Sequence, residues 1–119
     1  MSERRQCIRI SKSLEIEYRT VNRLMGSRSR STDISRAGIR LPIIEKFDPG
    51  TLLKLDIRFV GLKPISVVGE VVWMNEKKDG DFRFEIGVRF INITHYDREA
   101  LNSVIQKLED KGSGEVRWL

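Results

Sequence analysis

Apolar and polar residues alternate along much of the chain, and this two-residue period is typical of half-buried β-strands. The alternating segments are 14–19, 53–59 and 82–90, and a fourth segment, 67–74, is apolar on both faces. A strand that is apolar on both faces is expected in the middle of a sheet. Glycine, proline and aspartate lie between these segments and predict short turns.

The region between the first two clear strands has a weaker pattern. Serine and arginine alternate over 27–31, which predicts either an edge strand or a mobile loop. The following segment, 32–41, has few apolar residues, and Gly38 is its expected bend. The sequence therefore predicts five or six strands in all.

The period changes after the last strand. Thr94 and Asp97 have the spacing of a helix N-cap and its partner, and Lys111-Gly112 ends the helical pattern. The apolar stripe of this helix is Leu101, Val104, Ile105 and Leu108. These elements predict an all-β fold, a small antiparallel β-barrel with a C-terminal α-helix packed on it.

The chain of 119 residues is long enough for one domain with its own core. The expected parts are a mobile N-terminal arm (1–12), the barrel with its helix (13–112) and a loose tail (113–119). No apolar run approaches the length of a membrane span, and no signal peptide opens the sequence. We therefore expect a cytoplasmic protein without membrane insertion.

Positive charge is concentrated at the N-terminal end. The net formal charge is +5, and residues 1–40 hold ten Lys or Arg against four Asp or Glu. Nearly all of these ten cations are arginines, whose planar fork grips phosphates and guanine edges and stacks on bases. This distribution indicates an anionic partner, whereas a solvated basic surface is the simpler alternative.

Catalysis and metal binding have little support in the sequence. One cysteine, Cys7, and one histidine, His95, cannot form a structural zinc site, and no second residue is placed to activate either of them. No phosphate-binding glycine loop or nucleophile motif is present. We expect neither an enzyme nor a protein with a metal or cofactor.

Two short segments carry binding chemistry. In an extended arm, Arg5 and Arg9 point to the same side about 13 Å apart, which allows them to contact two sites on one ligand. Asp33 can accept hydrogen bonds from the N1–H and N2–H₂ groups of guanine. The Ser35 hydroxyl and the backbone turn at Gly38 can donate to phosphate.

Taken together, these segments resemble the PilZ domain, a bacterial receptor module for cyclic di-GMP. The matching stretches are RQCIR at 5–9 (the family's RxxxR), DISRAG at 33–38 (its [D/N]xSxxG), GEVVWMN at 69–75 and IGVRFINI at 86–93. The resemblance covers nearly the whole chain. It implies a six-stranded antiparallel barrel with a C-terminal helix and cyclic di-GMP as the ligand.

The resemblance also implies roles for individual residues. Two arginines of the first motif would contact guanine and phosphate, the aspartate would hold a guanine edge, and the serine and glycine would shape and line the pocket. An arginine before RxxxR is associated with a stacked pair of ligands. The implied ligand-binding residues are Arg4, Arg5, Arg9, Asp33, Ser35 and Gly38.

Three nearby residues have no required place in the motifs. Arg36 and Arg40 are interpreted as surface charges that add to the positive field. Trp73 lies where the family often has an aromatic or apolar residue, so both a place near the ligand and ordinary core packing stay open.

The resulting prediction is a cyclic di-GMP receptor that changes the conformation of its arm and signals in trans to an unknown partner protein, as a monomer or a dimer. The alternative from another class is a small barrel that binds RNA or single-stranded DNA through the basic N-terminal region. We consider nucleic acid the less favoured partner because the aromatic residues of 82–90 share a face with core residues. A further alternative is an adaptor that has the fold but binds no nucleotide.

Overall fold

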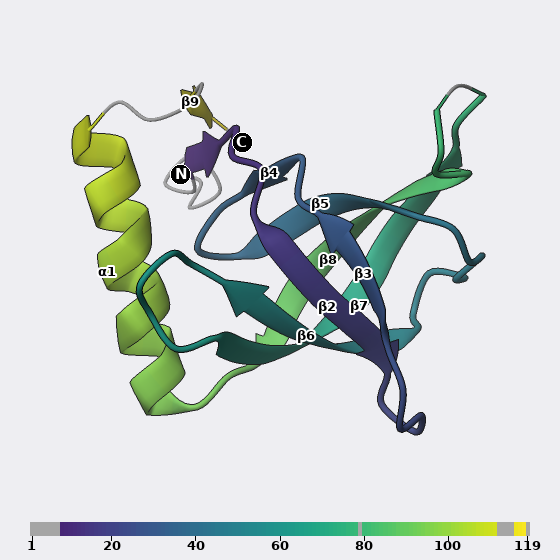
Figure 1. Ribbon diagram of the computed structural model, residues 1–119, viewed down its shortest axis with the longest axis horizontal. Coiled ribbons are helices and arrows are strands. Elements are labelled where there is room, and N and C mark those ends of the chain that lie inside the picture. Colours follow the sequence, from purple (N-terminus) through teal and green to yellow (C-terminus); the bar gives the residue numbers. More distant parts are fainter. Residues whose placement is uncertain (1–7, 79, 112–115, 119) are drawn as a thin grey trace, which may run out of the picture.

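The computed structural model describes residues 8–78, 80–111 and 116–118, and it consists mainly of β-strands with one helix (Figure 1). The elements are β1 (Ile8–Ile10), β2 (Glu15–Thr20), β3 (Ser27–Arg30), β4 (Asp33–Ile34), β5 (Gly38–Ile43), β6 (Leu52–Arg58), β7 (Ile65–Glu76), β8 (Phe84–Asn92), α1 (His95–Lys111) and β9 (Val116–Trp118). Six of the strands have four or more residues, while β1, β4 and β9 are shorter.

The strands form one antiparallel sheet in the order β3-β2-β6-β7-β8-β5-β4-β1-β9, which confirms the predicted fold class. The sheet curls so that β3 and β5 lie side by side (Figure 1). In the described part of the chain, no backbone ladder joins the two ends of this order, β3 and β9. A side-chain contact links β3 to β5 instead, because the hydroxyl of Ser29 donates to the carbonyl of Pro42 at 2.5 Å.

The two-residue period of the sequence accounts for the core. Buried residues alternate along β5, β6 and the first half of β7, and in β2 the buried residues are Ile16 and Tyr18. Leu101 and Ile105 of α1 are also fully buried. The helix begins as predicted, because the side chain of Thr94 accepts a hydrogen bond from the backbone N–H of Asp97 at 3.1 Å.

The alternating serines and arginines form strand β3, an outcome that the sequence left open. The serines point inward and the arginines outward, so that Ser29 and Ser31 are buried while Arg28 and Arg30 are exposed. Buried hydroxyls require hydrogen-bond partners. Ser31 donates to the carbonyl of Lys12 at 2.5 Å, and its partners, like that of Ser29, come from distant parts of the chain.

Both ends of the chain contribute a short strand. Ile10 of β1 is fully buried, and β1 pairs with β4 on one side and with β9 on the other. The register places Ile8 opposite Trp118, so the two chain ends lie side by side. These strands fall within the segments predicted as an arm and a tail, whose mobility without ligand stays a prediction.

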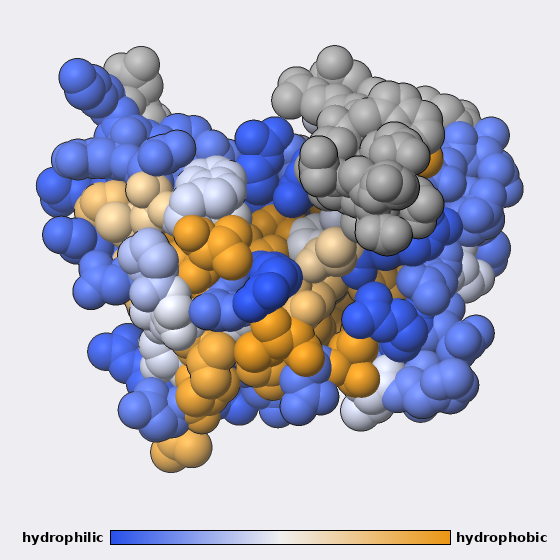
Figure 2. Space-filling model, turned by 180° about the vertical axis from the view of Figure 1, so that it is seen from behind, coloured by the Kyte–Doolittle hydropathy of each residue, from blue (hydrophilic) through white to orange (hydrophobic). Residues whose placement is uncertain are grey.

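The outer face of the sheet at β7 and β8 has exposed apolar residues. Figure 2 shows apolar surface in the middle of the face seen from behind, and Val72 and Ile91 of these strands are about half exposed. The carboxylate of Glu70 and the guanidinium of Arg89 form a cross-strand ion pair at 2.6 Å on this face. Among the described residues, no helix has the length and apolar character needed to cross a membrane.

Candidate nucleotide-binding site

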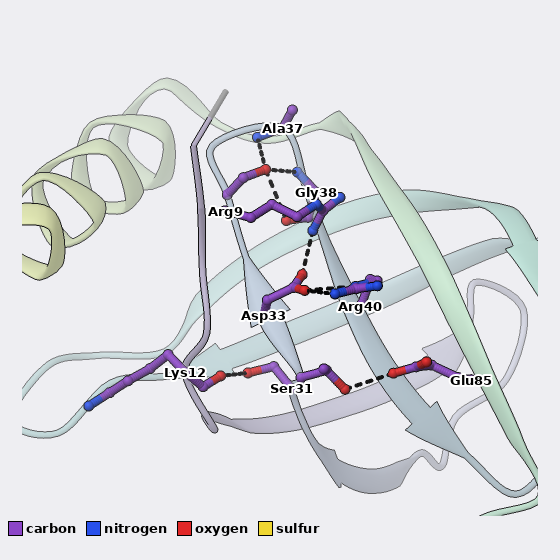
Figure 3. Close-up of polar contacts among 10 residues, drawn as sticks. Arg9, Lys12, Ser31, Asp33, Ala37, Gly38, Arg40 and Glu85 are labelled. Carbon is purple, nitrogen blue, oxygen red and sulfur yellow. Dashed lines mark hydrogen bonds and ion pairs between the residues drawn. The ribbon is translucent and has the colours of Figure 1, made fainter. Parts of the chain in front are cut away.

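The DISRAG segment forms a tight hairpin between β4 and β5. The backbone N–H of Ser35 donates to the carbonyl of Gly38 at 2.9 Å. The hydroxyl oxygen of Ser35 accepts hydrogen bonds from the backbone N–H groups of Ala37 at 3.1 Å and Gly38 at 3.2 Å (Figure 3). These hydrogen bonds fix the shape of the turn, and they are shielded from water because Ser35 is fully buried.

Gly38 is required by a close approach of two strands. A Cβ atom at this position would lie 2.3 Å from the carbonyl oxygen of Val88 on β8. The neighbouring carbonyl of Ala37 accepts a hydrogen bond from the backbone N–H of Phe90 at 2.9 Å, which holds the turn against β8. The φ angle of Gly38 is not positive, so the lack of a side chain, and not backbone freedom, explains the glycine.

Asp33 lies at the centre of a polar cluster. Its side chain is 2% exposed, and one carboxylate oxygen, Oδ1, accepts a hydrogen bond from Nη1 of Arg9 at 2.6 Å. Arg9 is on β1 and Asp33 on β4, and these strands pair at Ile10 and Ile34. The fold therefore brings together two motifs that are 24 residues apart in the chain.

Arg40 is a second partner of Asp33 that the sequence interpretation missed. Its Nε donates to Oδ2 of Asp33 at 2.7 Å, and its Nη2 contacts the same oxygen. Figure 3 shows the side chains of Arg9 and Arg40 both pointing toward the carboxylate. The hydrogen bond to Asp33 raises the pKa of Arg40, which stays protonated. The signal in the sequence was the tight turn, because a hairpin with Ser35 opposite Gly38 must place Asp33 opposite Arg40.

Arg36 was interpreted as a surface charge, and it contacts α1. Its guanidinium donates to Glu109 at 3.3 Å and to the side-chain oxygen of Gln106 at 3.2 Å. Arg98 of the helix donates in return to the backbone carbonyl of Arg36 at 3.0 Å. The side chain of Arg36 therefore ties the DISRAG turn to the C-terminal helix.

The sequence that contains this cluster matches the model of a known protein family. The family model described as PilZ domain matches residues 3–107, which is most of the chain. The chain belongs to the PilZ domain family. The matched region contains both the RxxxR motif and the DISRAG motif. Among the residues that the structure describes, Arg9, Asp33, Ser35 and Gly38 belong to these motifs.

Solved structures have the same fold at low sequence identity. The inhibitor of motility MotI/DgrA from Bacillus subtilis is 20% identical with a TM-score of 0.75, over 92% of this chain and 53% of that chain. The PilZ domain of YcgR from Escherichia coli with c-di-GMP is 18% identical with a TM-score of 0.71, over 92% and 95%. The PilZ domain of CeSA from a cellulose-synthesizing bacterium is 12% identical with a TM-score of 0.63, over 85% and 97%.

The coverage differs among these relatives. This chain spans about half the length of the MotI/DgrA structure, whereas it spans nearly all of the isolated YcgR and CeSA PilZ domains. No curated protein matches the sequence of this chain. The comparisons therefore establish the PilZ fold for this chain.

Trp73 lies on the same outer surface as the Asp33 cluster of the PilZ domain. The register of the strands places Trp73 opposite Gly87, Gly87 opposite Arg40, and Arg40 opposite Asp33. A Cβ atom at Gly87 would lie 2.3 Å from Nε1 of Trp73, so the indole ring covers this glycine. Trp73 is half-buried, and its indole lies over Gly87, the residue that pairs with Arg40 on β5.

Two predicted site residues, Arg4 and Arg5, lie outside the described residues, as does Cys7. Their places in the site stay predictions from the family motif. Arg9 is thus the described arginine of the RxxxR motif.

A separate pocket of about 590 Å³ is lined by residues of β2, β3 and β6 and by Phe82, and none of its lining residues belongs to the PilZ motifs. Its walls include the arginines of the Ser-Arg segment, but acidic residues lie beside them. Arg30 is 3.6 Å from Glu15, and Arg58 is 3.6 Å from Glu17. This ladder of opposite charges reduces the positive potential that a nucleic acid would require.

Proposed function

We propose that this PilZ domain is a cyclic di-GMP receptor. The observation that carries the proposal is the contact between Arg9 and Asp33, which joins the two binding motifs in one cluster. Support also comes from the YcgR PilZ domain, whose structure contains c-di-GMP and shares the fold. In the proposed complex, Arg9 contacts guanine and phosphate, and Asp33 accepts from a guanine edge. Ser35 and Gly38 shape the turn beneath them.

Arg4 and Arg5 complete the proposed site. A stacked pair of cyclic di-GMP molecules carries four phosphate charges, which two arginines cannot balance. A third guanidinium adds charge and a flat surface for stacking on guanine. We therefore propose two ligands per domain in the wild type and one in Arg4→Leu, to be counted by titration calorimetry. A wild-type stoichiometry of one would contradict the stacked pair.

The proposed output is a change in the N-terminal arm that a partner protein reads. The arm has many like charges and few apolar residues, and a ligand with two phosphates neutralises those charges. Hydrogen exchange of residues 4–12 is expected to slow when cyclic di-GMP binds. Equal exchange with and without ligand would count against an ordering of the arm, and a pull-down in both states tests the partner.

Titration of the full chain with cyclic di-GMP, cyclic di-AMP and a short single-stranded oligonucleotide tests the receptor proposal. We expect tight binding of cyclic di-GMP only. Oligonucleotide binding that falls steeply between low and high salt, without binding of cyclic di-GMP, would support the nucleic-acid alternative. An absence of binding to all three would support an adaptor with the PilZ fold.

A further inference from the structure

Two arginines hold the two oxygens of the Asp33 carboxylate. Arg9 holds Oδ1, and Arg40 holds Oδ2 through two of its nitrogen atoms. The Asp33 side chain is almost inaccessible, whereas those of Arg9 and Arg40 are 19% and 28% exposed. A guanine edge can therefore reach the carboxylate only where one of these guanidinium groups moves away.

One of the two arginines must remain when the ligand enters. A buried carboxylate that loses its cations is strongly destabilised, because its hydration is not restored. The neutral N–H groups of a guanine edge replace hydrogen bonds but bring no positive charge. The ligand can thus displace one guanidinium from Asp33 at low cost, but not both.

The two arginines differ in how firmly the fold holds them. Arg40 lies within β5, which pairs with β4 at Asp33 and with β8 at Gly87. Its backbone carbonyl accepts from the N–H of Thr32 at 2.8 Å. The register of β1 with β4, in contrast, consists of one residue pair, and the rest of its pairing is with β9 at the chain end.

The surroundings of Arg40 also restrict its side chain. Gly87, its neighbour on β8, is covered by the indole of Trp73, so the space over that glycine is occupied. The carboxylate of Glu85, which accepts a hydrogen bond from Thr32 at 2.8 Å, adds a favourable charge interaction with Arg40. These contacts therefore hold the guanidinium of Arg40 beside Asp33.

We propose that Arg40 is a positioning residue of the ligand site, which stays on Oδ2 of Asp33 while Arg9 leaves Oδ1 for the ligand. This inference rests on the proposed binding of cyclic di-GMP. Arg40 holds the carboxylate in place through Oδ2, so that Oδ1 faces the N1–H and N2–H₂ groups of guanine. The released guanidinium of Arg9 is then free to contact guanine or phosphate.

Arg40→Gln tests this assignment. Without Arg40, Arg9 becomes the last cation on Asp33 and resists displacement, so affinity for cyclic di-GMP is expected to fall by about 10- to 100-fold, as when an orienting partner is lost. The preference for cyclic di-GMP over cyclic di-AMP is expected to narrow as well. Because Arg40 contacts no phosphate, the dependence of log K on log salt should keep its wild-type slope, whereas Arg9→Gln should lower it.

A second background separates positioning from general stability. In Asp33→Asn the carboxamide is neutral and needs no cation, so adding Arg40→Gln is expected to cause little further loss of affinity. Arg30→Gln is the matched control, because Arg30 also pairs with a carboxylate on a strand but lies on the β2–β3 face. It should bind like the wild type.

The outcomes are distinct. If the wild type binds cyclic di-GMP and Arg40→Gln has the same affinity and selectivity, the positioning role is overturned while the receptor proposal stands. A lowered salt slope would also overturn it, because it would show direct contact of Arg40 with phosphate. Failure of the wild type to bind would overturn the receptor proposal and this inference together.

Arg40→Lys replaces Arg40→Gln if the latter does not fold. Lysine retains the charge but cannot contact Oδ2 through two nitrogens, so we expect an intermediate affinity for cyclic di-GMP. Wild-type affinity in Arg40→Lys would reject the positioning role.

Discussion

Asp33 and Glu45 are two carboxylates that each receive hydrogen bonds from two distant side chains, yet their partners differ in kind. Asp33 is held by the guanidinium groups of Arg9 and Arg40. Glu45, in the connection after β5, is held by hydroxyls: Tyr18 donates at 2.6 Å and Ser27 at 2.8 Å. Guanidinium groups on long side chains can turn to another anion, whereas a tyrosine ring fixed in the core cannot.

The difference extends to the surroundings. Tyr18 is nearly fully buried, and its ring packs edge-to-face on Phe47 with centroids 6.2 Å apart. Burial, followed by the bond to Glu45, raises the pKa of Tyr18, so this group stays a donor at every relevant pH. The Glu45 cluster therefore joins β2, β3 and the connection after β5 permanently. The Asp33 cluster has partners that can be exchanged, which suits a ligand site.

Arg9→Ala, in the Asp33 cluster, is expected to have the largest effect of all, a loss of ligand affinity without a loss of stability. It removes a charge-assisted contact to the ligand, so the affinity for cyclic di-GMP should fall by about 10- to 100-fold. Asp33 keeps Arg40, so the melting temperature should change little. Calorimetry and thermal unfolding measure the two quantities. Arg28→Ala, with the same loss of charge on β3, should keep full affinity, and a loss there equal to that in Arg9→Ala would contradict the site.

Asp33→Ala is expected to reduce selectivity more than any other single change. The variant leaves the N–H donors of guanine without an acceptor in the site, an effect of about tenfold for each such hydrogen bond. Binding of cyclic di-GMP and cyclic di-AMP to both proteins gives the selectivity. If the wild type binds both dinucleotides equally, the role proposed for Asp33 is wrong.

The sequence predicted the elements whose pattern is local. Strand alternation and the stripe of α1 follow from which residues face the core, and the N-cap at Thr94 depends on neighbours in the chain. The family motif placed Arg9 and Asp33 in the same ligand site, but their direct ion pair across 24 residues of the chain was not predicted.

The features that the sequence left open or missed depend on long-range partners. Strand β3 has serines on its inner face, and only the positions of Pro42 and Lys12 show how their hydroxyls are satisfied. The ladder between β1 and β9 joins the two chain ends, which no local pattern connects. Arg40 was interpreted as a surface charge because it has no required place in the family motifs, and only the pairing of β4 with β5 shows that Asp33 lies opposite it.

Tyr18→Phe is expected to affect the Glu45 cluster alone. The variant keeps the ring and removes the donor to Glu45, which should lower the free energy of unfolding by about 1 to 2 kcal/mol. Chemical denaturation measures this, and binding of cyclic di-GMP should be unchanged. Tyr96→Phe is the control, because Tyr96 is exposed on α1 and its hydroxyl should contribute little. Equal effects of the two variants would remove the case for a structural role of the cluster.

Glu45→Gln is expected to have the smallest effect, which is measured as a change in how the free energy of unfolding depends on pH. Burial alone would raise the pKa of Glu45, but the hydrogen bonds from Tyr18 and Ser27 and the charge of Arg23 together lower it below the ordinary value of 4.5. A carboxyl whose pKa is lower in the folded state stabilises the protein above the unfolded pKa, and this contribution is lost as the pH falls through the folded pKa. Glutamine does not titrate, so the free energy of unfolding of Glu45→Gln should decline less between pH 7 and about pH 3 than that of the wild type. Denaturation at both pH values measures the difference, and the exposed Glu99→Gln should follow the wild type. A decline in Glu45→Gln equal to that of the wild type would show that the hydroxyl partners do not favour the charged form of Glu45.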